Sequence, residues 1–535
     1  MADDSPASLP RAPWQRVIAL LRPSHRHTAF SATLLLMASA MLSRVIGLVR
    51  VKYIAYLLGR SAAADAFNAA FQLPDMISYF LVGGAASITF VTMLSRYRDS
   101  GREDEGERAM SVILTVMACV LGGAILIGEL LAPLFVHLVI GFQGHPDTAA
   151  LCAQLTRILL PAQLFFFAGG VFGSVLLVRK QFAFQAVSPL IYNLGTILGG
   201  VLLGKVLGVP SLALGTLAGA MLGPFLLNVI GAHRAGMRYR PAFDLSNPGF
   251  REWVRLSIPL MLGVSLVSFD GWIMNHFASQ KTGAISALAY AKMLFTAPVA
   301  LGQAAGAASL PFLVTLFGKG DRGVFSGAVN TSVSRILAFS LLASAWMIGL
   351  AFPVVDLLFR GGSFHRADAG TMAVYFGIFS VALCFWSAQA LYARAFYAAG
   401  NTLAPMVAGT IVVLVSLPIY WWMYRAYGAT GLAIASDIGI LIQTGTLAAM
   451  LHRRGMVLLS GLEYAELARS ALAALLALVA IYLLRRVMPA TGRVNDLLVL
   501  AAATAAWLLI AGAVLRLTGS DLPRQLLSRF GGKAA

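Results

Sequence analysis

Hydrophobic residues occur along this chain in long, nearly unbroken stretches that are separated by short polar segments. A helix needs about 20 apolar residues to cross the roughly 30 Å hydrocarbon core of a bilayer. The pattern therefore predicts about 14 transmembrane helices, several of them long enough to require a tilt or a kink. The expected spans lie near residues 30–58, 66–95, 110–140, 149–177, 183–206, 211–232, 255–279, 284–317, 333–358, 369–398, 403–426, 429–450, 465–487 and 495–517.

The composition agrees with this pattern and excludes several classes of protein. Of the 535 residues, 59% are hydrophobic and 12% are charged, and the mean hydropathy is +0.80. Soluble domains are about 45–50% apolar and about 25% charged, so a soluble enzyme, a disordered chain and a disulfide scaffold are excluded. An outer-membrane barrel is excluded as well, because its strands alternate apolar and polar residues. The expected fold is an all-α, polytopic membrane protein.

The sequence lacks the usual signs of catalysis and of bound cofactors. Cys119, Cys152 and Cys384 lie far apart in apolar stretches, without the paired spacing of a zinc site or a disulfide framework. There is no Walker A, nucleophile-elbow or HExxH motif, and no polar segment is long enough for a soluble catalytic domain. We therefore expect a protein that is not an enzyme and that has no metal site and no cofactor.

Basic residues outnumber acidic ones by 40 to 22, which gives a formal net charge of +18. In a membrane protein this excess is typical of cytoplasmic loops that face anionic lipid, and we expect no nucleic-acid partner. The positive-inside rule then places both termini in the cytoplasm, because most of the basic loop residues follow even-numbered spans. They include Arg96, Arg98, Arg102, Arg108, Arg179, Lys180, Arg234, Arg238, Arg240, Arg453 and Arg454, whereas Arg485, Arg486 and Arg493 are exceptions.

A weak internal repeat predicts two similar six-helix bundles. Residues 174–193 resemble 390–409, with an offset of 216 at Pro189 and Pro405, and 208–223 resemble 428–443, with an offset of 220. Such a repeat is typical of transporters that bind their substrate between the two halves, although glycine-rich helices can also resemble one another by chance. The expected parts are a cytoplasmic tail at 1–28, bundles at 29–235 and 236–453, two additional transmembrane helices at 454–518 and a cytoplasmic tail at 519–535.

The first span carries charged residues that could bind an anionic substrate. A charge inside a membrane costs at least about 2.5–3.5 kcal/mol, so it needs a partner, a wet cavity or a function. Arg44 and Arg50 are six residues apart, or about 120° around a helix, and both can border one wide cavity. Guanidinium groups offer planar, bidentate donors to phosphate oxygens, which would suit a pyrophosphate. Arg50 and Lys52 could instead snorkel from the helix end.

Two carboxylates open the second span. Asp65 could pair with one of the arginines and orient it until substrate competes, and it could equally cap the start of a helix. Asp75 follows Pro74 and could cap a helix that restarts at a kink.

The seventh and eighth spans contain a second pair of charges. Asp270, beside Gly271 and Asn275, offers hard oxygen ligands to a small coupling cation such as Na⁺. Lys292 would add positive charge to the substrate site from the second bundle, and a direct pairing of Asp270 with Lys292 is the competing structural interpretation. Weaker candidates are Asp437, Asp356, Glu129 and His276.

The order of these residues resembles a known transporter family. SRVIGLVR (43–50), ADAFNAAFQLPD (64–75) and GGAASITFV (83–91) resemble the start of the MurJ/MviN family of the multidrug/oligosaccharidyl-lipid/polysaccharide exporter superfamily. LAYAKMLFTAPVALGQAAGAASLPFL (288–313) is similar to the eighth span of that family. The resemblance extends over most of the chain, including the number of spans and the two-bundle repeat.

The resemblance implies a flippase of the bacterial inner membrane that moves lipid II, the undecaprenyl-pyrophosphate-linked peptidoglycan precursor, to the periplasmic leaflet for cell-wall synthesis. Family members use alternating access, driven by Na⁺, H⁺ or the membrane potential, and the implied partners are the lipid-linked substrate, membrane lipids and cell-wall synthesis proteins. Arg44, Arg50 and Asp65 match charged residues that are important in the family. The alternatives are a flippase for another polyprenyl-linked oligosaccharide, a cation-coupled multidrug exporter and, from a different class, a membrane glycosyltransferase.

Two departures from the family pattern reduce its expected cationic cluster. A basic pair and an acid of the family are replaced by Ser78, Tyr79 and Gly83. In the eighth span a basic position falls on Met293, and Lys292 stands where the family has an acid. These departures bear on the head group of the substrate more than on the flippase class.

Overall fold

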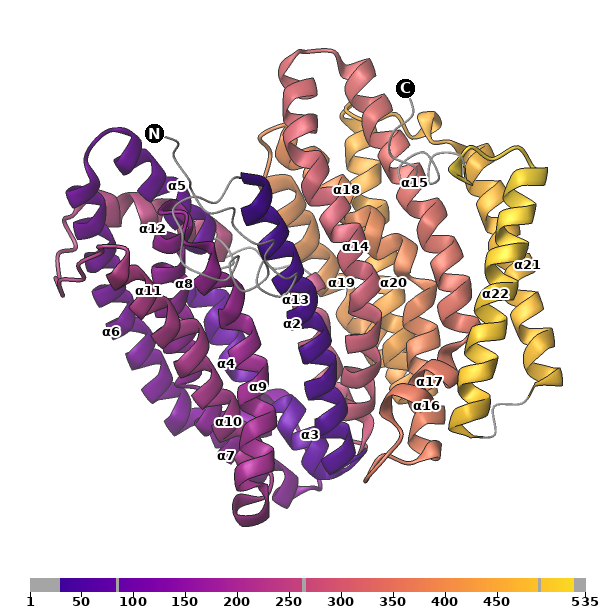
Figure 1. Ribbon diagram of the computed structural model, residues 1–535, viewed down its shortest axis with the longest axis horizontal. Helices are drawn as coiled ribbons and strands as arrows, with labels where there is room; N and C mark the ends of the chain where they lie inside the picture. The colour runs from indigo at the N-terminus through magenta and orange to yellow at the C-terminus, as the bar shows by residue number, and fades with distance from the viewer. Residues whose placement is uncertain (1–28, 83–85, 262–265, 489–491, 524–535) are drawn as a thin grey trace, which may run out of the picture. The chain divides into compact units, whose positions relative to one another are not determined.

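The computed structural model describes residues 29–82, 86–261, 266–488 and 492–523 (Figure 1). Every regular element in these residues is helical, and an isolated antiparallel bridge joins Gly361 to Phe364. This confirms the all-α prediction. The contacts within the chain define two units, which we call unit 1 (Met1–Arg50, Ala70–Phe135 and Leu151–Leu262) and unit 2 (Val51–Ala69, Val136–Ala150 and Gly263–Ala535).

Unit 1 surrounds a core to which the helices α5, α6, α8 and α12 contribute. Phe90 of α5 stacks on Trp253 of α12 with 5.6 Å between ring centroids, and Phe167 of α8 contacts the same phenylalanine edge-on. Its helices are the first part of α2 (Ala29–Leu58), α4 (Gln72–Ile77), η1 (Ser78–Val82), α5 (Ala86–Asp99), α6 (Glu103–Phe135), most of α7 (Pro146–Leu159), α8 (Ala162–Val178), α9 (Phe182–Leu207), α10 (Pro210–Ala220), η3 (Met221–Leu227), α11 (Asn228–Arg234) and α12 (Pro248–Met261).

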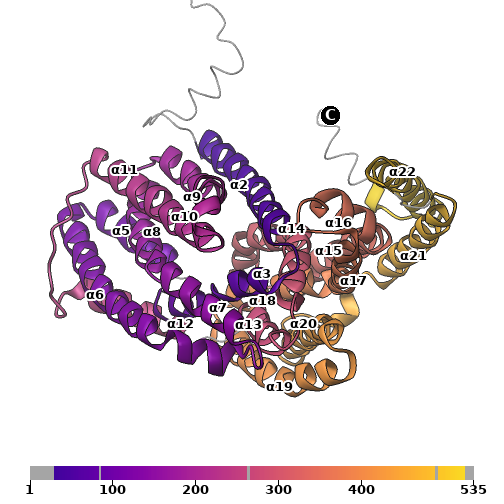
Figure 2. The same cartoon turned by 90° about the horizontal axis from the view of Figure 1, so that it is seen from below.

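Unit 2 has its core between α14, α15, α18 and α20, where Phe325, Tyr392 and Phe396 are buried. The C-terminal helices α21 and α22 lie side by side and pack on α15 and α16 (Figure 2). The helices of this unit are the end of α2, α3 (Ala62–Ala69), η2 (Val136–Ile140), α13 (Leu266–Ala278), α14 (Ala284–Gly318), α15 (Arg322–Gly349), α16 (Ala351–Phe359), α17 (Arg366–Val381), α18 (Leu383–Ala398), α19 (Leu403–Tyr427), α20 (Ala429–Arg453), η4 (Leu459–Gly461), α21 (Tyr464–Val487) and α22 (Arg493–Leu517).

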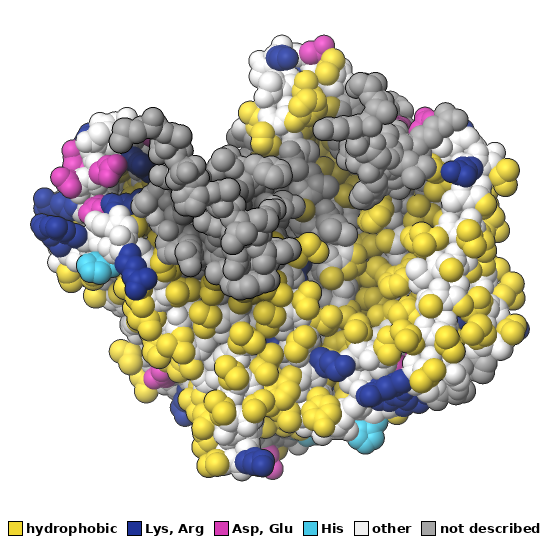
Figure 3. All heavy atoms as spheres, in the orientation of Figure 1, with side chains coloured by type: hydrophobic (Ala, Val, Ile, Leu, Met, Phe, Trp, Pro, Cys, Tyr) yellow, Lys and Arg dark blue, Asp and Glu magenta, His cyan; other side chains and the backbone are white. Residues whose placement is uncertain are grey.

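Ten of the described helices are long and apolar enough to cross a membrane, or eleven if the bent pair α17 and α18 forms one span. Most of them end within a few residues of the predicted spans, as α9, α19 and α22 illustrate. Hydrophobic side chains are the most frequent coloured type on the face that Figure 3 shows. The total of about 14 stays a prediction, because the expected spans at 66–95 and 255–279 include residues outside the described set.

The internal repeat has an offset of 220 residues both before and after α9 and α19. Lys180 and Gly400 both have a left-handed backbone, with φ of 59° and 73°. Gly208 and Gly428 end α9 and α19 with nearly the same dihedral angles, φ 60°, ψ −134° and φ 61°, ψ −140°. The offset of 216 at the two prolines is therefore wrong: Pro189 is the eighth residue of α9, whereas Pro405 is the third residue of α19.

The first unit extends beyond residue 235, where the sequence placed the end of the first bundle. Helix α12 belongs to it because Trp253, which is 2% exposed, packs into the core of that unit beside Phe90. Segments of α2 and α7 contribute to both units. The predicted parts were continuous ranges of the sequence and could not describe this division.

Candidate functional site

One face of α2 attaches this helix to α9 within unit 1. The Ser39 hydroxyl donates to the carbonyl of Ala186, and the Asn193 amide donates to the Ser43 hydroxyl at 3.2 Å. Arg50 lies about 20° from Ser39 around the helix, so it points to the same side. Its guanidinium carbon lies 5.5 Å from the centre of the Tyr192 ring, in the geometry of a cation–π contact.

Arg50 forms no ion pair with a carboxylate among the described residues, which is the usual way to stabilise a buried cation. Its side chain is partly buried, and its Nε is buried without a hydrogen-bond acceptor. Asp75 lies close enough to influence the Tyr192 hydroxyl electrostatically, but the described part of the chain shows no ion pair between Arg50 and a carboxylate. Among the described residues, Arg50 therefore interacts with Tyr192 and with no carboxylate partner in an ion pair.

Arg44 occupies a different face of the same helix. It lies about 140° from Ser39 around the helix, away from α9, and its side chain is exposed. The two arginines therefore lie about 120° apart around α2, and the expectation that both border one wide cavity stays a prediction. Among the described residues of unit 1, Arg44 makes no hydrogen bond or ion pair. Its role in substrate binding stays a prediction.

Asp65 is buried in unit 2 and caps a helix distant from it in the sequence. Its carboxylate accepts hydrogen bonds from the backbone N–H groups of Gly283 and Ser286, the latter at 2.7 Å. These groups open α14, whose first N–H donors have no partners within the helix. Arg60 contacts the same turn, because its Nε donates to the Gly283 carbonyl at 3.1 Å. The described contacts of Asp65 thus give it a structural role and do not include Arg44 or Arg50.

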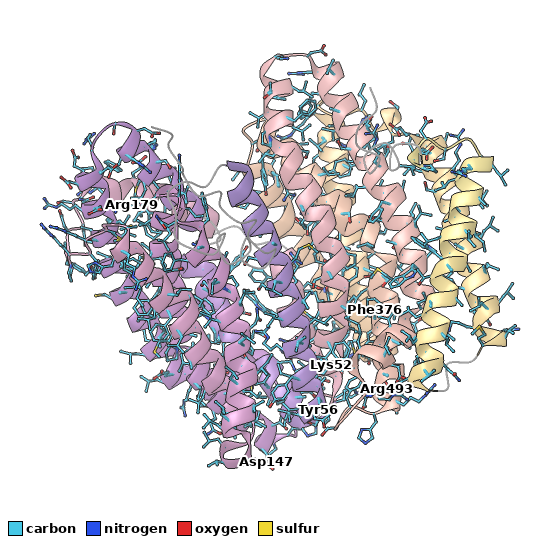
Figure 4. The ribbon with its side chains drawn as sticks, viewed as in Figure 1. Lys52, Tyr56, Asp147, Arg179, Phe376 and Arg493 are labelled. Carbon is cyan, nitrogen blue, oxygen red and sulfur yellow. The ribbon has the colours of Figure 1, made fainter. Side chains whose placement is uncertain are left out.

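The end of α2 continues into unit 2, where it presents Lys52 and Tyr56 (Figure 4). Lys52 is exposed, which agrees with a side chain that extends toward the membrane surface. The Tyr56 carbonyl accepts a hydrogen bond from Ser363 at 2.8 Å and so ties α2 to the turn before α17.

Asp270 and Lys292 form the ion pair that the sequence left as one of two alternatives. The side chain of Asp270 is fully buried and that of Lys292 is 21% exposed. The other oxygen of Asp270 accepts a hydrogen bond from the Tyr420 hydroxyl of α19. The Lys292 ammonium also lies 5.9 Å from the centre of the Trp386 ring on α18. This arrangement joins α13, α14, α18 and α19 through one charged network.

A second carboxylate completes this network. Asp437 of α20 interacts electrostatically with both Asp270 and Lys292, and its Oδ1 is buried without a hydrogen-bond partner. Two carboxylates and one ammonium leave one negative charge when all three groups are ionised. Because an uncompensated charge is costly at this depth, the network has room for one additional positive charge, either a proton or a small cation.

Two of the weaker candidates, Asp356 and His276, make structural contacts in the described residues. Buried Asp356 pairs with Arg360 at 3.1 Å, and Arg360 also approaches Asp496 of α22. Arg493, which Figure 4 shows at the start of α22, donates to the Arg360 carbonyl at 2.7 Å. The His276 ring contacts the Val139 carbonyl at 2.7 Å.

Sequence reasoning missed the aromatic members of both sites and underrated Asp437. Tyr192, Tyr420 and Trp386 carry no signal of their own in an apolar stretch, because aromatic residues there are most often ordinary core. Of the departures from the family pattern, Ser78 and Tyr79 lie in the π-helix η1 and Met293 lies on α14, whereas Gly83 is outside the described residues.

A polytopic helical fold with an internal repeat and charged groups inside both units is typical of a membrane transporter. Two solved structures share the fold. One is entitled lipid II flippase MurJ, inward closed conformation (TM-score 0.76, 21% identity, 90% of this chain and 99% of that one). The other is an inward-facing multidrug resistance MATE transporter (TM-score 0.63, 14% identity, 79% of this chain and 98% of that one).

The sequence comparisons identify the family. The family model described as lipid II flippase MurJ matches residues 54–503. The lipid II flippase MurJ of Burkholderia cenocepacia is 26% identical over 436 residues, which cover 80% of this chain and 84% of the relative. The chain belongs to the lipid II flippase MurJ family.

Proposed function

We propose that this protein is a flippase that moves lipid II from the cytoplasmic to the periplasmic leaflet of the bacterial inner membrane, for peptidoglycan synthesis. The family match over residues 54–503 carries this proposal. The basic character of the first helix supports it, because Arg44 and Arg50 are intramembrane cations without carboxylate partners among the described residues. The lipid-linked precursor is anionic at its pyrophosphate, which matches guanidinium chemistry.

In this mechanism the two arginines have different tasks. Arg44, exposed on its face of α2, makes bidentate contact with phosphate oxygens, whereas Arg50 is kept in place by Tyr192 and supplies a fixed positive potential. The sugar-peptide head group crosses in a wet cavity, and the lipid tail stays in the bilayer. Alternating access then exposes the bound head group to one side of the membrane at a time.

We further propose that the network of Asp270, Lys292 and Asp437 couples transport to a cation gradient or to the membrane potential. When all three groups are ionised the network has one negative charge in excess, and binding of H⁺ or Na⁺ would neutralise it. Asp270 is already bound to the Lys292 ammonium and the Tyr420 hydroxyl, so Asp437 is the carboxylate that would receive the incoming cation. No organic cofactor takes part in this proposal.

The basic loops determine the proposed orientation, with both termini in the cytoplasm. The loop residues Arg96, Arg98 and Arg179 of unit 1 form ion pairs with Glu252, Glu103 and Glu107 respectively. These loops would face anionic lipid and provide a surface for cell-wall synthesis proteins.

The test is complementation of a bacterium depleted of its own lipid II flippase. We expect the parent protein to restore growth, and Arg44→Ala to fail because the phosphate contact is lost. Arg335→Ala is the matched control, since Arg335 is an exposed arginine of α15 that the proposed contact does not involve. A parent protein that reaches the membrane without restoring growth would contradict lipid II as the cargo. Equal rescue by Arg44→Ala would contradict the arginine contact.

The same assay, together with deletion of the gene for this protein, distinguishes the alternative functions. Transport of another polyprenyl-linked oligosaccharide predicts no rescue of growth but accumulation of a different lipid-linked glycan when the gene is deleted. A multidrug exporter predicts a change in drug resistance and favours an acidic or aromatic cavity, which the basic α2 does not support.

A further inference from the structure

The helices α19 and α20 form a hairpin in unit 2 and lie side by side in Figures 1 and 2. A groove of about 460 Å³ runs between them along their outer faces. On α19 its wall repeats every four residues, so the lining side chains share one face of the helix. They include Leu403, Val407, Ile411 and Val415, which are 63%, 45%, 55% and 48% exposed.

The groove has the length of one bilayer leaflet. From Leu403 to Val415 the helix rises about 18 Å, at about 1.5 Å per residue. Half of the hydrocarbon core is about 15 Å thick. The groove therefore begins at the end of the hairpin where α19 starts and ends near the middle of the membrane, which fits a lipid chain entering from one surface.

The polar groups of the groove are concentrated at its surface end. Asn401 and Arg454 line this end, and none of the described residues that line the groove is acidic. The Arg454 guanidinium carbon lies 5.7 Å from the Phe396 ring, and Arg453 beside it is exposed. This end is therefore positively charged, whereas the depth of the groove is apolar. That pattern is complementary to an anionic head group with an acyl chain below it.

The equivalent hairpin of unit 1 is closely packed at the matching position. There Gly223 lies so close to α9 that an added Cβ would be 2.6 Å from the Ser188 carbonyl oxygen. At the repeat offset of 220 its counterpart is Gln443, whose long side chain is buried. The two hairpins therefore differ in side-chain size at this matching position.

We propose that this groove binds one acyl chain of an anionic phospholipid, with its phosphate at Arg454 and Asn401. The basic end places the lipid in the leaflet that the loop charges assign to the cytoplasm, where anionic lipids are concentrated. The site is separate from the charged network of Asp270 and from the arginines of α2, so lipid binding is measured without reference to transport.

The experiment is native mass spectrometry of the full-length protein, purified in detergent and incubated with equal amounts of phosphatidylglycerol and phosphatidylethanolamine. The parent protein is expected to retain phosphatidylglycerol in preference to phosphatidylethanolamine. Arg454→Gln is expected to weaken that binding about fivefold, the effect of one arginine near a lipid surface. Arg234→Gln is the matched control, because Arg234 is the exposed counterpart of Arg454 at the repeat offset of 220.

A second variant tests the groove itself. Val407→Trp fills it and is expected to reduce the bound phosphatidylglycerol, whereas Leu414→Trp, at a 62% exposed position of α19 outside the groove, is expected to leave it unchanged. The proposal is overturned if Arg454→Gln and Arg234→Gln bind phosphatidylglycerol equally well. It is also overturned if Val407→Trp and Leu414→Trp retain equal amounts of this lipid. Equal retention of both lipids, or displacement of phosphatidylglycerol by equimolar undecaprenyl phosphate, would overturn it as well.

Discussion

The two units carry opposite charges at equivalent positions of the repeat. Arg50 and Asp270 are 220 residues apart, and each lies eight residues before the last residue of its helix, α2 or α13. Arg50 is partly buried over an aromatic ring, without a carboxylate partner among the described residues. Asp270 is fully buried and bound by Lys292 and Tyr420.

This difference shows how one repeated framework can support two tasks. A guanidinium whose partner is a ring face keeps its net charge and can attract an anion. A carboxylate bound by an ammonium is neutralised locally, and its energy depends on every other charge in the network. In the proposed mechanism the first unit therefore attracts the anionic substrate, and the second unit receives the cation that changes the charge balance.

The largest expected effect comes from breaking the neutralised pair of unit 2. Lys292→Met leaves the buried Asp270 without its counter-ion and is expected to cost about 3 kcal/mol of unfolding free energy. Denaturation of the purified protein in detergent would measure this cost. The control is the double variant Asp270→Asn with Lys292→Met, which removes both charges and should recover much of the stability. If the double variant were as unstable as Lys292→Met alone, the loss of stability would not come from the unpaired charge of Asp270.

The next effect tests the close packing of α9 and α10 in unit 1. An added Cβ at Gly199 would lie 2.5 Å from the Ser211 carbonyl oxygen, so Gly199→Ala must push the helices apart and is expected to cost about 2 kcal/mol. Gly204→Ala on the same helix is the matched control, because its nearest neighbour is 3.8 Å away. That substitution should be neutral or stabilise by up to about 1 kcal/mol, the advantage of alanine over glycine in a helix. Thermal unfolding of the two variants would measure both effects. An equal loss of stability in Gly199→Ala and Gly204→Ala would contradict this packing.

A smaller effect is expected at the cap of α14. Asp65→Ala removes two hydrogen bonds to the backbone and should destabilise the protein by about 1.5 kcal/mol, within the range for caps and charged acceptors. Asp321→Ala removes the exposed cap of α15, where the carboxylate accepts from Val324 at 3.0 Å, and should cost less, about 0.5 kcal/mol. Chemical denaturation ranks the two variants. If Asp65→Ala abolished rescue of growth without any loss of stability, Asp65 would act on the substrate and not as a cap.

The smallest effect is expected at the exposed arginine. Arg44→Ala should change the stability by no more than about 0.5 kcal/mol, because the side chain makes no polar contact among the described residues of its unit. Arg50→Lys should cost under about 1 kcal/mol, since a lysine keeps the charge but loses the stacking on Tyr192. Thermal melting of both variants beside the complementation assay separates binding from folding. A large loss of stability in Arg44→Ala would mean that the residue supports the fold.

The sequence alone determined the class of fold and most helix positions. Lipid cannot satisfy backbone polar groups, so each long apolar stretch has to be helical, and hydropathy then gives its limits. For this reason α9, α19 and α22 end within a few residues of their predicted spans. The same cost of intramembrane charge directed attention to Arg50, Asp270 and Lys292 before any contact was known.

Only the tertiary structure decided what those charges touch. Asp65 caps a turn 218 residues away in the sequence, and Tyr420 reaches Asp270 across 150 residues, distances that no local pattern encodes. The two alternatives for Asp270 and Lys292 were equally open in the sequence, because a pair and two separate sites require the same residues. The groove between α19 and α20 likewise depends on how closely two apolar helices pack, which side-chain volumes determine only once the helices are in contact.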